Sequence, residues 1–214
     1  MRTAPFAAPF ALLAAILICG SAFAANPHPS RGTLTLDPAH TQISFTLGGS
    51  IHTTEGTFQL KSGTITADPE TGQANGQVVI DANSANTNES MRDSKMKGSV
   101  LETQRYPEIF FVPERIRGHE NPNGDFAAKV TGILRLHGSD HEITLDVSGH
   151  LAGNYLAATT HFVVPYVAWG MTDPSVLFLR VADVVDVTIA ASGHMIWGDG
   201  VMKSAPSSRA TPAR

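Results

Sequence analysis

The sequence predicts an all-β fold, an antiparallel β-barrel of about eight to ten strands with one short helical insertion. Segments with apolar residues at every second position recur along the chain, as at 43–47, where Ile43, Phe45 and Leu47 alternate with polar side chains. This period is typical of strands with one buried face. One long polar stretch, 81–107, breaks the period. A closed barrel leaves no exposed sheet edge, but a two-sheet sandwich with a filled core fits the same period and stays an alternative.

In chain order, the apolar segments predict strands at 43–47, 64–67, 77–80, 109–112, 128–136, 143–147, 156–164, 177–182 and 185–189. Turn residues join several of these segments. Residues 68–72 (Asp-Pro-Glu-Thr-Gly) and 121–124 (Asn-Pro-Asn-Gly) combine proline with glycine, which favours tight turns. Residues 138–140 (Gly-Ser-Asp) predict a hairpin between the strands on either side of them.

The polar stretch predicts the helical insertion. Its first part, 81–88, is a run of turn formers, and residues 89–97 then have helical spacing with Met91 and Met96 as apolar contacts. Gly98 is expected to end the helix, because glycine tolerates the left-handed conformation of a C-cap. Ordering such an insertion is costly unless it covers something, so we expect it to cover the open mouth of a barrel.

The N-terminal segment predicts export. Residues 1–24 combine a single charge, Arg2, with an apolar run and a small-residue cleavage motif, as secretory signal peptides do. The run is too short to span a bilayer as a helix. We therefore expect the mature protein to be periplasmic or secreted, without stable membrane insertion. Cys19, the only cysteine, lies inside the signal peptide, and the bulky Ile18 before it argues against lipidation.

One domain is expected after the signal peptide. A lead-in spans residues 25–32, the β-barrel domain spans 33–193, and the remaining residues, 194–214, form a tail that we expect to be disordered. The formal net charge is −4, and no cluster of Lys and Arg is present. This charge pattern argues against nucleic-acid binding.

No catalytic motif is recognisable, so we predict a binding protein that is not an enzyme and has no catalytic residue and no cofactor. The sequence contains no Gly-x-Ser-x-Gly elbow and no His-Glu-x-x-His motif. A metal-assisted hydrolase using His137, Asp140 and His141 is one alternative. A specific metal site usually needs more ligands and supporting contacts. We therefore prefer to interpret the two histidines as surface hairpin residues, with no metal.

Several motifs resemble the YceI family in order and spacing. They are Asp37-Pro38-Ala39-His40 with the strand after it, Gly56-Thr57-Phe58, Ile80-Asp81 with Ser84 and Thr87, Arg92-Asp93, Met96-Lys97, Tyr106-Pro107-Glu108-Ile109, and Gly132-Ile133-Leu134-Arg135-Leu136-His137-Gly138. The resemblance covers residues 34–193 and favours the barrel over the sandwich. It implies a lipocalin-like antiparallel barrel that binds an isoprenoid or another long-chain lipid in its interior. A homodimer is a further expectation inherited from the family.

Two departures from the family pattern change the expected ligand. Relatives carry an Arg-x-x-Phe-Gly-like motif where this chain has Tyr166, Trp169 and Gly170 without the arginine. The family histidine of the first hairpin is also missing, with Gly48 in its place. A pyrophosphate would find fewer cationic partners, so a neutral or weakly polar lipid such as a quinone is favoured. Tyr166 and Trp169 suit such a ligand, or plug one end of the barrel as core.

The candidate ligand-binding residues are Phe45, Phe58, Arg92, Phe111, Leu134, Leu136, Phe162, Tyr166, Trp169 and Met171. An eight-stranded barrel is just wide enough to be filled or to hold one ligand. A filled barrel that acts through its outer surface is thus the main alternative function. Two roles stay open for Arg92: contact with a polar lipid head, or a structural tie from the insertion to a neighbouring strand, with Asp93 bonded to the first turn or a loop.

Overall fold

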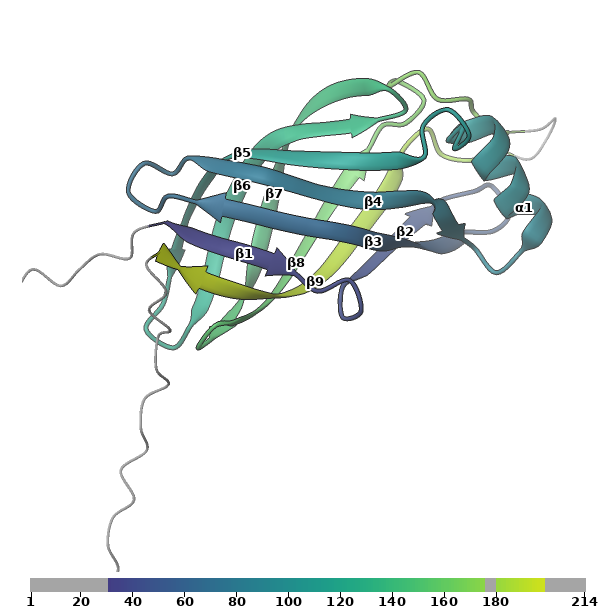
Figure 1. The fold of residues 1–214 in the computed structure, drawn as a ribbon. Helices are drawn as coiled ribbons and strands as arrows, with labels where there is room; N and C mark the ends of the chain where they lie inside the picture. The colour runs from purple at the N-terminus through teal and green to yellow at the C-terminus, as the bar shows by residue number, and fades with distance from the viewer. Residues whose placement is uncertain (1–30, 176–179, 199–214) are drawn as a thin grey trace, which may run out of the picture.

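The computed structural model describes residues 31–175 and 180–198, and within them the chain forms a strand-rich barrel with one short helix (Figure 1). The strands are β1 (Gly32–Leu36), β2 (Gln42–Leu47), β3 (Thr54–Ala67), β4 (Ala74–Asn86), β5 (Glu108–Glu120), β6 (Asp125–Leu136), β7 (Ser139–Ala152), β8 (Tyr155–Val164) and β9 (Val185–Trp197). The α-helix α1 (Ser90–Lys95) and a π-helical turn, η1 (Met96–Val100), connect β4 to β5. The predicted signal peptide with Cys19 and residues 199–214 lie outside the described residues.

The strands close into one antiparallel ring. β3 to β9 pair in chain order, and β2 closes the ring by pairing with both β9 and β3. β1 continues the line of β2, because it pairs with the other ends of the same two strands. The ring therefore has eight members, β2 to β9, and β1 extends one of them. The predicted all-β barrel is confirmed, and the described residues do not divide into the two sheets of a sandwich.

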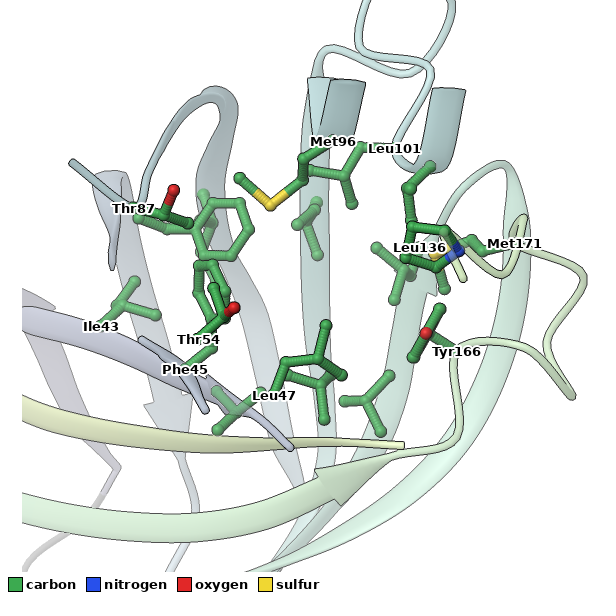
Figure 2. A pocket seen from close by; sticks show the side chains of 18 of the residues that line it. Ile43, Phe45, Leu47, Thr54, Thr87, Met96, Leu101, Leu136, Tyr166 and Met171 are labelled. Carbon is green, nitrogen blue, oxygen red and sulfur yellow. The ribbon is translucent and has the colours of Figure 1, made fainter. Parts of the chain in front are cut away.

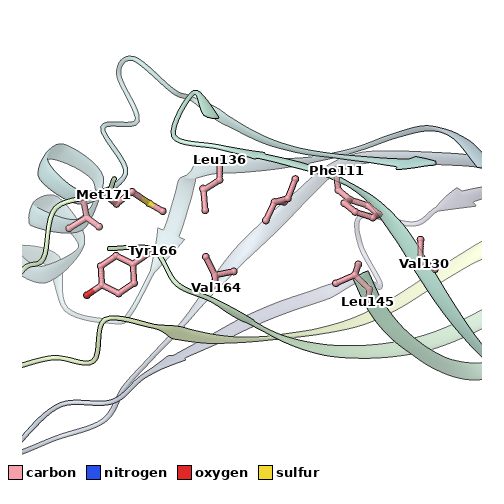
Figure 3. Packing of buried hydrophobic residues seen from close by; sticks show 9 residues of the cluster. Phe111, Val130, Leu136, Leu145, Val164, Tyr166 and Met171 are labelled. Carbon is pink, nitrogen blue, oxygen red and sulfur yellow. The ribbon is translucent and has the colours of Figure 1, made fainter. Parts of the chain in front are cut away.

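The barrel interior is filled towards one end. Phe111, Val130 and Leu145 belong to a buried cluster that packs between the strands there. Figure 3 shows these three side chains away from α1, whereas Tyr166 and Met171 of the same cluster lie beside it. At the α1 end the inward side chains surround a cavity, which is the candidate site.

β4 is longer than predicted and includes residues that were expected to form a turn. The strand continues through residues 81–86. Polar side chains satisfy its irregular backbone, because the N–H of Asn83 donates to Asp81 Oδ1 (2.8 Å) and the N–H of Gln59 donates to Ser84 Oγ (2.7 Å). The prediction of a turn over 81–88 is therefore wrong for this part, since turn formers here stabilise a bulged strand.

The helical insertion forms as predicted, but it ends differently. α1 ends at Lys95 and passes directly into η1, which runs through Gly98. The N–H of Leu101 donates to the carbonyl oxygen of Met96 (2.8 Å), which is the wider spacing of a π-helix. Gly98 does not adopt the positive φ of a C-cap glycine, so the predicted helix end is wrong.

β5 continues beyond its predicted end at residue 112 and reaches Glu120. The sequence did not predict this continuation, because Pro113 follows the expected end and proline cannot donate a hydrogen bond to a β-ladder. The strand accommodates the proline with a register shift between Pro113 and Arg115 opposite β6, as bulged strands do. Pro113 is fully buried, so this shift lies in the barrel wall.

The last third of the chain differs from the predictions at two places. β9 continues to Trp197, so residues 194–197 of the predicted disordered tail belong to the barrel. Val181 forms only an isolated bridge with Gly49 where a strand was predicted at 177–182, and residues 177–179 lie outside the described part. Sequence alternation gave no sign of either difference.

Gly76 allows β3 and β4 to approach closely. Its φ is 117°, and a Cβ at this position would lie 2.1 Å from the carbonyl oxygen of Thr64. We expect Gly76→Ala to lower the free energy of unfolding by about 1–3 kcal/mol, because the backbone would be strained or the strands would separate. Chemical denaturation of the purified variant measures this change.

Gly98→Ala is the matched control for this substitution. No heavy atom lies within 4 Å of the Cβ position at Gly98. Alanine is favoured over glycine in helical backbone by about 1 kcal/mol, so the control is expected to be as stable as the wild type or slightly more stable. Wild-type stability of Gly76→Ala would contradict the close approach of the two strands.

Candidate functional site

An apolar cavity of about 510 Å³ occupies the barrel end that lies next to α1. Figure 2 shows the side chains that surround it, contributed by the strands, the helical insertion and the segment after β8. The strand residues of its wall are Ile43, Phe45, Leu47, Thr54, Phe58, Ile80, Ile109, Leu134, Leu136, Phe162, Val164, Val185, Val187 and Ile189. Only Thr54 among them carries a polar side-chain group. The wall therefore offers apolar surface and very few hydrogen-bonding groups.

The alternation of β2 and β9 shows how the sequence builds this wall. Ile43, Phe45 and Leu47 occupy every second position of β2 and line the cavity. Across the strand pair, Ile43 faces Ile189 and Phe45 faces Val187. Cross-strand partners point to the same face of a sheet, so the two strands present one continuous apolar surface to the interior.

The insertion between β4 and β5 covers the cavity. Its lining residues are Met91, Arg92, Lys95, Met96, Val100 and Leu101. Glu89 caps α1, because its carboxylate accepts from the N–H groups of Met91 (3.0 Å) and Arg92 (2.7 Å). Met91 lines the cavity although it is 80% exposed, so it lies at the rim. In the described part of the chain, no helix is long and apolar enough to cross a membrane.

Thr87, which is buried, holds the start of the insertion together. Its N–H and its hydroxyl both donate to Asp93 Oδ1, at 2.9 and 2.6 Å. Arg92 Nε donates to the same hydroxyl oxygen (2.7 Å), and Arg92 Nη2 donates to the carbonyl oxygen of Thr87 (2.9 Å). The hydroxyl bond holds the pKa of the Asp93 carboxyl below its ordinary value of 3.8, although burial opposes this. These contacts support a structural role for Arg92, with Thr87 just after β4 as its partner.

The segment after β8 completes the rim. Tyr166 and Met171 are buried and line the cavity. Tyr166 Oη donates to the carbonyl oxygen of Ala182 (2.9 Å). Burial, followed by the nearby carboxylates of Asp173 and Asp183, raises the pKa of Tyr166 to about 12. The phenol therefore stays protonated at neutral pH, and its hydroxyl proton takes part in the hydrogen bond to Ala182.

Lys95 connects the insertion to the segment after β8. Its Nζ donates to the carbonyl oxygen of Pro174 (3.0 Å), and both residues line the cavity. Arg92 also lines the cavity, with Nε and Nη2 bonded to Thr87. Both cations at the rim thus have partners within the protein.

Eight of the ten predicted binding residues line the cavity, namely Phe45, Phe58, Arg92, Leu134, Leu136, Phe162, Tyr166 and Met171. Their contact with a ligand stays a prediction. Phe111 is instead part of the buried core, and Trp169 packs against that core. The Trp169 ring stacks on His141, with ring centroids 3.9 Å apart and an angle of 6° between the planes. Phe111 and Trp169 therefore do not line the cavity.

Sequence reasoning missed several wall and rim residues. Val185 and Ile189 were assigned to the closing strand, but their inward direction was not predictable, because a shift of one residue reverses the two faces of a strand. Met96 had a usable signal, since its helical spacing from Met91 indicated an apolar contact. No sequence signal indicated Lys95, because its bond to Pro174 joins segments that are far apart in the sequence.

The side chains of the hydrolase alternative have separate partners. Both carboxylate oxygens of Asp140 accept from Arg135, at 2.6 and 2.9 Å. His137 Nε2 lies 3.4 Å from a carboxylate oxygen of Glu102, and His141 stacks on Trp169. Within residues 31–175 and 180–198, no three His, Cys, Asp or Glu side chains gather as a metal site would require. The proposed ligand set of that alternative is not assembled.

Comparison with known families identifies the barrel. Residues 34–192 match the YceI-like domain, which is three quarters of the chain or nearly all of its described part. The chain belongs to the YceI family. The resemblance noted in the sequence is thereby confirmed, and the YceI match begins in β1 and ends in β9. No curated protein matches this sequence.

Solved structures of other proteins share this fold. BcnA from Burkholderia cenocepacia has a TM-score of 0.59 and 22% sequence identity, and the similarity covers 73% of this chain and 98% of BcnA. A polyisoprenoid binding domain from Saccharophagus degradans, implicated in plant cell wall breakdown, has a TM-score of 0.56 and 15% identity, with 78% and 99% covered. At these identities the similarity shows the fold alone.

The bonds between Thr87 and Asp93 predict a pH-dependent contribution to stability. The Asp93 carboxyl has a lower pKa in the folded chain than in the unfolded chain, where it is about 3.9. The bonds therefore stabilise the fold above that value, and the stabilisation disappears as the pH falls through the folded-state pKa. We expect Asp93→Asn to be less stable than the wild type at neutral pH and to approach it below about pH 4. Urea denaturation over this pH range measures the difference.

Thr87→Val is the companion variant. It removes the hydroxyl that donates to Asp93 but keeps the backbone N–H bond. We expect it to weaken the pH dependence without abolishing it, and to lower the free energy of unfolding by about 1–3 kcal/mol at neutral pH. Parallel pH profiles for the wild type and Asp93→Asn would show that Asp93 does not make this contribution.

Proposed function

We propose that this YceI protein is an exported, non-enzymatic binding protein that sequesters or carries an isoprenoid or a similar long-chain apolar molecule inside its barrel. The cavity is the observation that carries the proposal. Its volume of about 510 Å³ falls within the roughly 300–1,000 Å³ of small-molecule sites. A hollow interior favours this function over a filled barrel that acts through its outer surface. The polyisoprenoid binding domain that shares the fold supports isoprenoids as the first ligand class to test.

Apolar burial supplies the affinity in this proposal. Each Å² of apolar surface removed from water contributes about 25 cal/mol, and side chains such as Phe45, Leu134 and Phe162 provide that surface. The loss of translational and rotational freedom on binding subtracts from this gain. A long chain gains more than a short one until it no longer fits, so shape and length decide which molecules bind.

The rim favours a neutral or weakly polar head group, such as that of a quinone, a prenol or a fatty amide. Arg92 uses Nε and Nη2 on Thr87, and Lys95 uses Nζ on Pro174. A diphosphate head would have to compete with these bonds for its cationic partners. A neutral head makes no such demand and leaves the insertion intact.

Export places the proposed ligand in an aqueous compartment, where a long apolar chain needs a carrier. The proposal of export rests on residues 1–24 of the sequence. Cell fractionation, with mass spectrometry of the mature N-terminus, tests it directly. A mature chain that begins at Ala25 in the periplasm or the medium is expected, and an unprocessed chain in the cytoplasm would overturn export.

Native mass spectrometry of protein purified from its native compartment tests the ligand proposal. We expect a bound mass that extracts into organic solvent and is identified as an isoprenoid or another long-chain lipid. Protein that is free of lipid, and that stays free after incubation with prenols, quinones and fatty amides, would overturn the proposal.

A bulky residue in the cavity wall is expected to block binding. Val187 lines the cavity from near the start of β9. We expect Val187→Trp to reduce lipid binding at least about tenfold, since a misfit of even one methylene costs 10- to 200-fold in an apolar pocket. Competition between wild type and variant for one prenol, read by native mass spectrometry, measures the loss.

Val163→Trp is the matched control. Val163 lies on the neighbouring strand β8 and is 48% exposed, so its side chain points away from the interior. The same substitution there is expected to leave lipid binding unchanged. Equal binding by a folded Val187→Trp variant would place the ligand elsewhere on the molecule.

A further inference from the structure

We infer that Phe111 sets the maximum length of the apolar chain that the cavity accepts. This inference rests on the proposed function and adds a specificity-determining residue to it. Phe111 does not line the cavity, yet the residue two positions before it on β5, Ile109, does. Its cross-strand partner on β6, Leu134, lines the cavity as well. Phe111 is therefore the next inward side chain beneath the cavity wall.

The side chains beyond Phe111 belong to the filled part of the barrel. Phe111 is 8% exposed and belongs to the same buried cluster as Val130 and Leu145, neither of which lines the cavity. In Figure 3 these three side chains lie together on the far side of Leu136 from Met171. A chain that enters next to α1 and extends beyond the lining residues therefore reaches the Phe111 ring next.

Gly132 explains why an aromatic ring fits at this level. It faces Pro113 across the β5–β6 pair, and a Cβ at Gly132 would lie 3.0 Å from Phe111 Cε2. The ring thus occupies space that a side chain on β6 would otherwise take. The same Cβ would lie 2.3 Å from the carbonyl oxygen of Val112, so residue 132 cannot take over as the barrier by gaining a side chain.

Leu60 of β3 also lies behind the lining residues. It is buried and packs in one cluster with Ile43 and Ile80, which line the cavity, while Leu60 itself does not. Phe111 is the larger of these two side chains, and it belongs to the filled core. No polar group of the ligand is involved, so the selection acts by exclusion: a chain that is too long leaves apolar surface in water.

Competition between prenols of different length tests the inference. Geranylgeraniol and geranylfarnesol, which differ by one isoprene unit, are offered together to the intact mature protein, and native mass spectrometry reads the ratio of the two bound forms. We expect the wild type to favour geranylgeraniol. We expect Phe111→Ala to shift the ratio towards geranylfarnesol at least about tenfold, because the lost ring opens an apolar space comparable to one isoprene unit.

Two further variants control the experiment. Phe110→Ala removes the adjacent ring from the other face of β5, where residue 110 pairs with Val79 and Arg135, and is expected to keep the wild-type ratio. Phe111→Leu makes a smaller void and keeps the test available if Phe111→Ala fails to fold. It is expected to shift the ratio in the same direction by a smaller factor.

Each outcome bears on one of the two proposals. A folded Phe111 variant that binds prenols with the wild-type ratio overturns the length-setting role and leaves the proposed function intact. An equal shift in Phe110→Ala also overturns it, because the effect would then follow from general loosening of β5. A wild type that binds neither prenol, nor any shorter one such as farnesol or geraniol, overturns the proposed function and this inference with it.

Discussion

The interior of an eight-stranded ring can only just be filled by side chains, and this chain fills one part of it and leaves the other hollow. Both parts share the strands β3 to β9, and the wall is completed by β2 next to α1 and by β1 at the other end. The difference lies in which side chains reach the axis. Phe111, Val130 and Leu145 meet within the filled part, whereas the side chains next to α1 end at an open space. Closure of the ring therefore creates the site, and the choice of inward residues decides where it ends.

A hollow end needs a cover, and the insertion supplies one whose polar groups are satisfied locally. Glu89 caps the first turn of α1, and Thr87 bonds both Asp93 and Arg92. These bonds span only a few residues, so they hold the insertion together without any contact to a ligand. Lys95 adds one bond to the segment after β8. The apolar side chains of the insertion, such as Met96, are then free to face the interior.

The sequence predicted the parts of this structure that follow from local pattern. Alternation identified most strands, helical spacing identified the insertion, and eight of the ten candidate residues line the cavity. The errors arise where distant contacts override local preference. Residues 81–86 read as turn formers but continue β4, because β3 pairs with them and Ser84 receives a bond from Gln59. Phe111 and Trp169 do not line the cavity, because register and loop packing decide which side chains reach it.

Side chains in the filled part of the barrel and side chains in the hollow part have different effects when they are changed. Removing a buried residue of the filled part, such as Leu145, leaves a void in a packed core and reduces stability. A wall residue such as Phe162 already has empty space on one side, so it loses fewer contacts when it is changed. Its substitution alters the shape offered to a ligand more than the stability of the fold. Phe111 lies at the boundary, because its ring is packed in the core while Ile109, the inward residue before it on β5, lines the cavity. A residue in that position is constrained in size from two sides, which is the physical reason that it, and not a more accessible wall residue, sets the depth of the site.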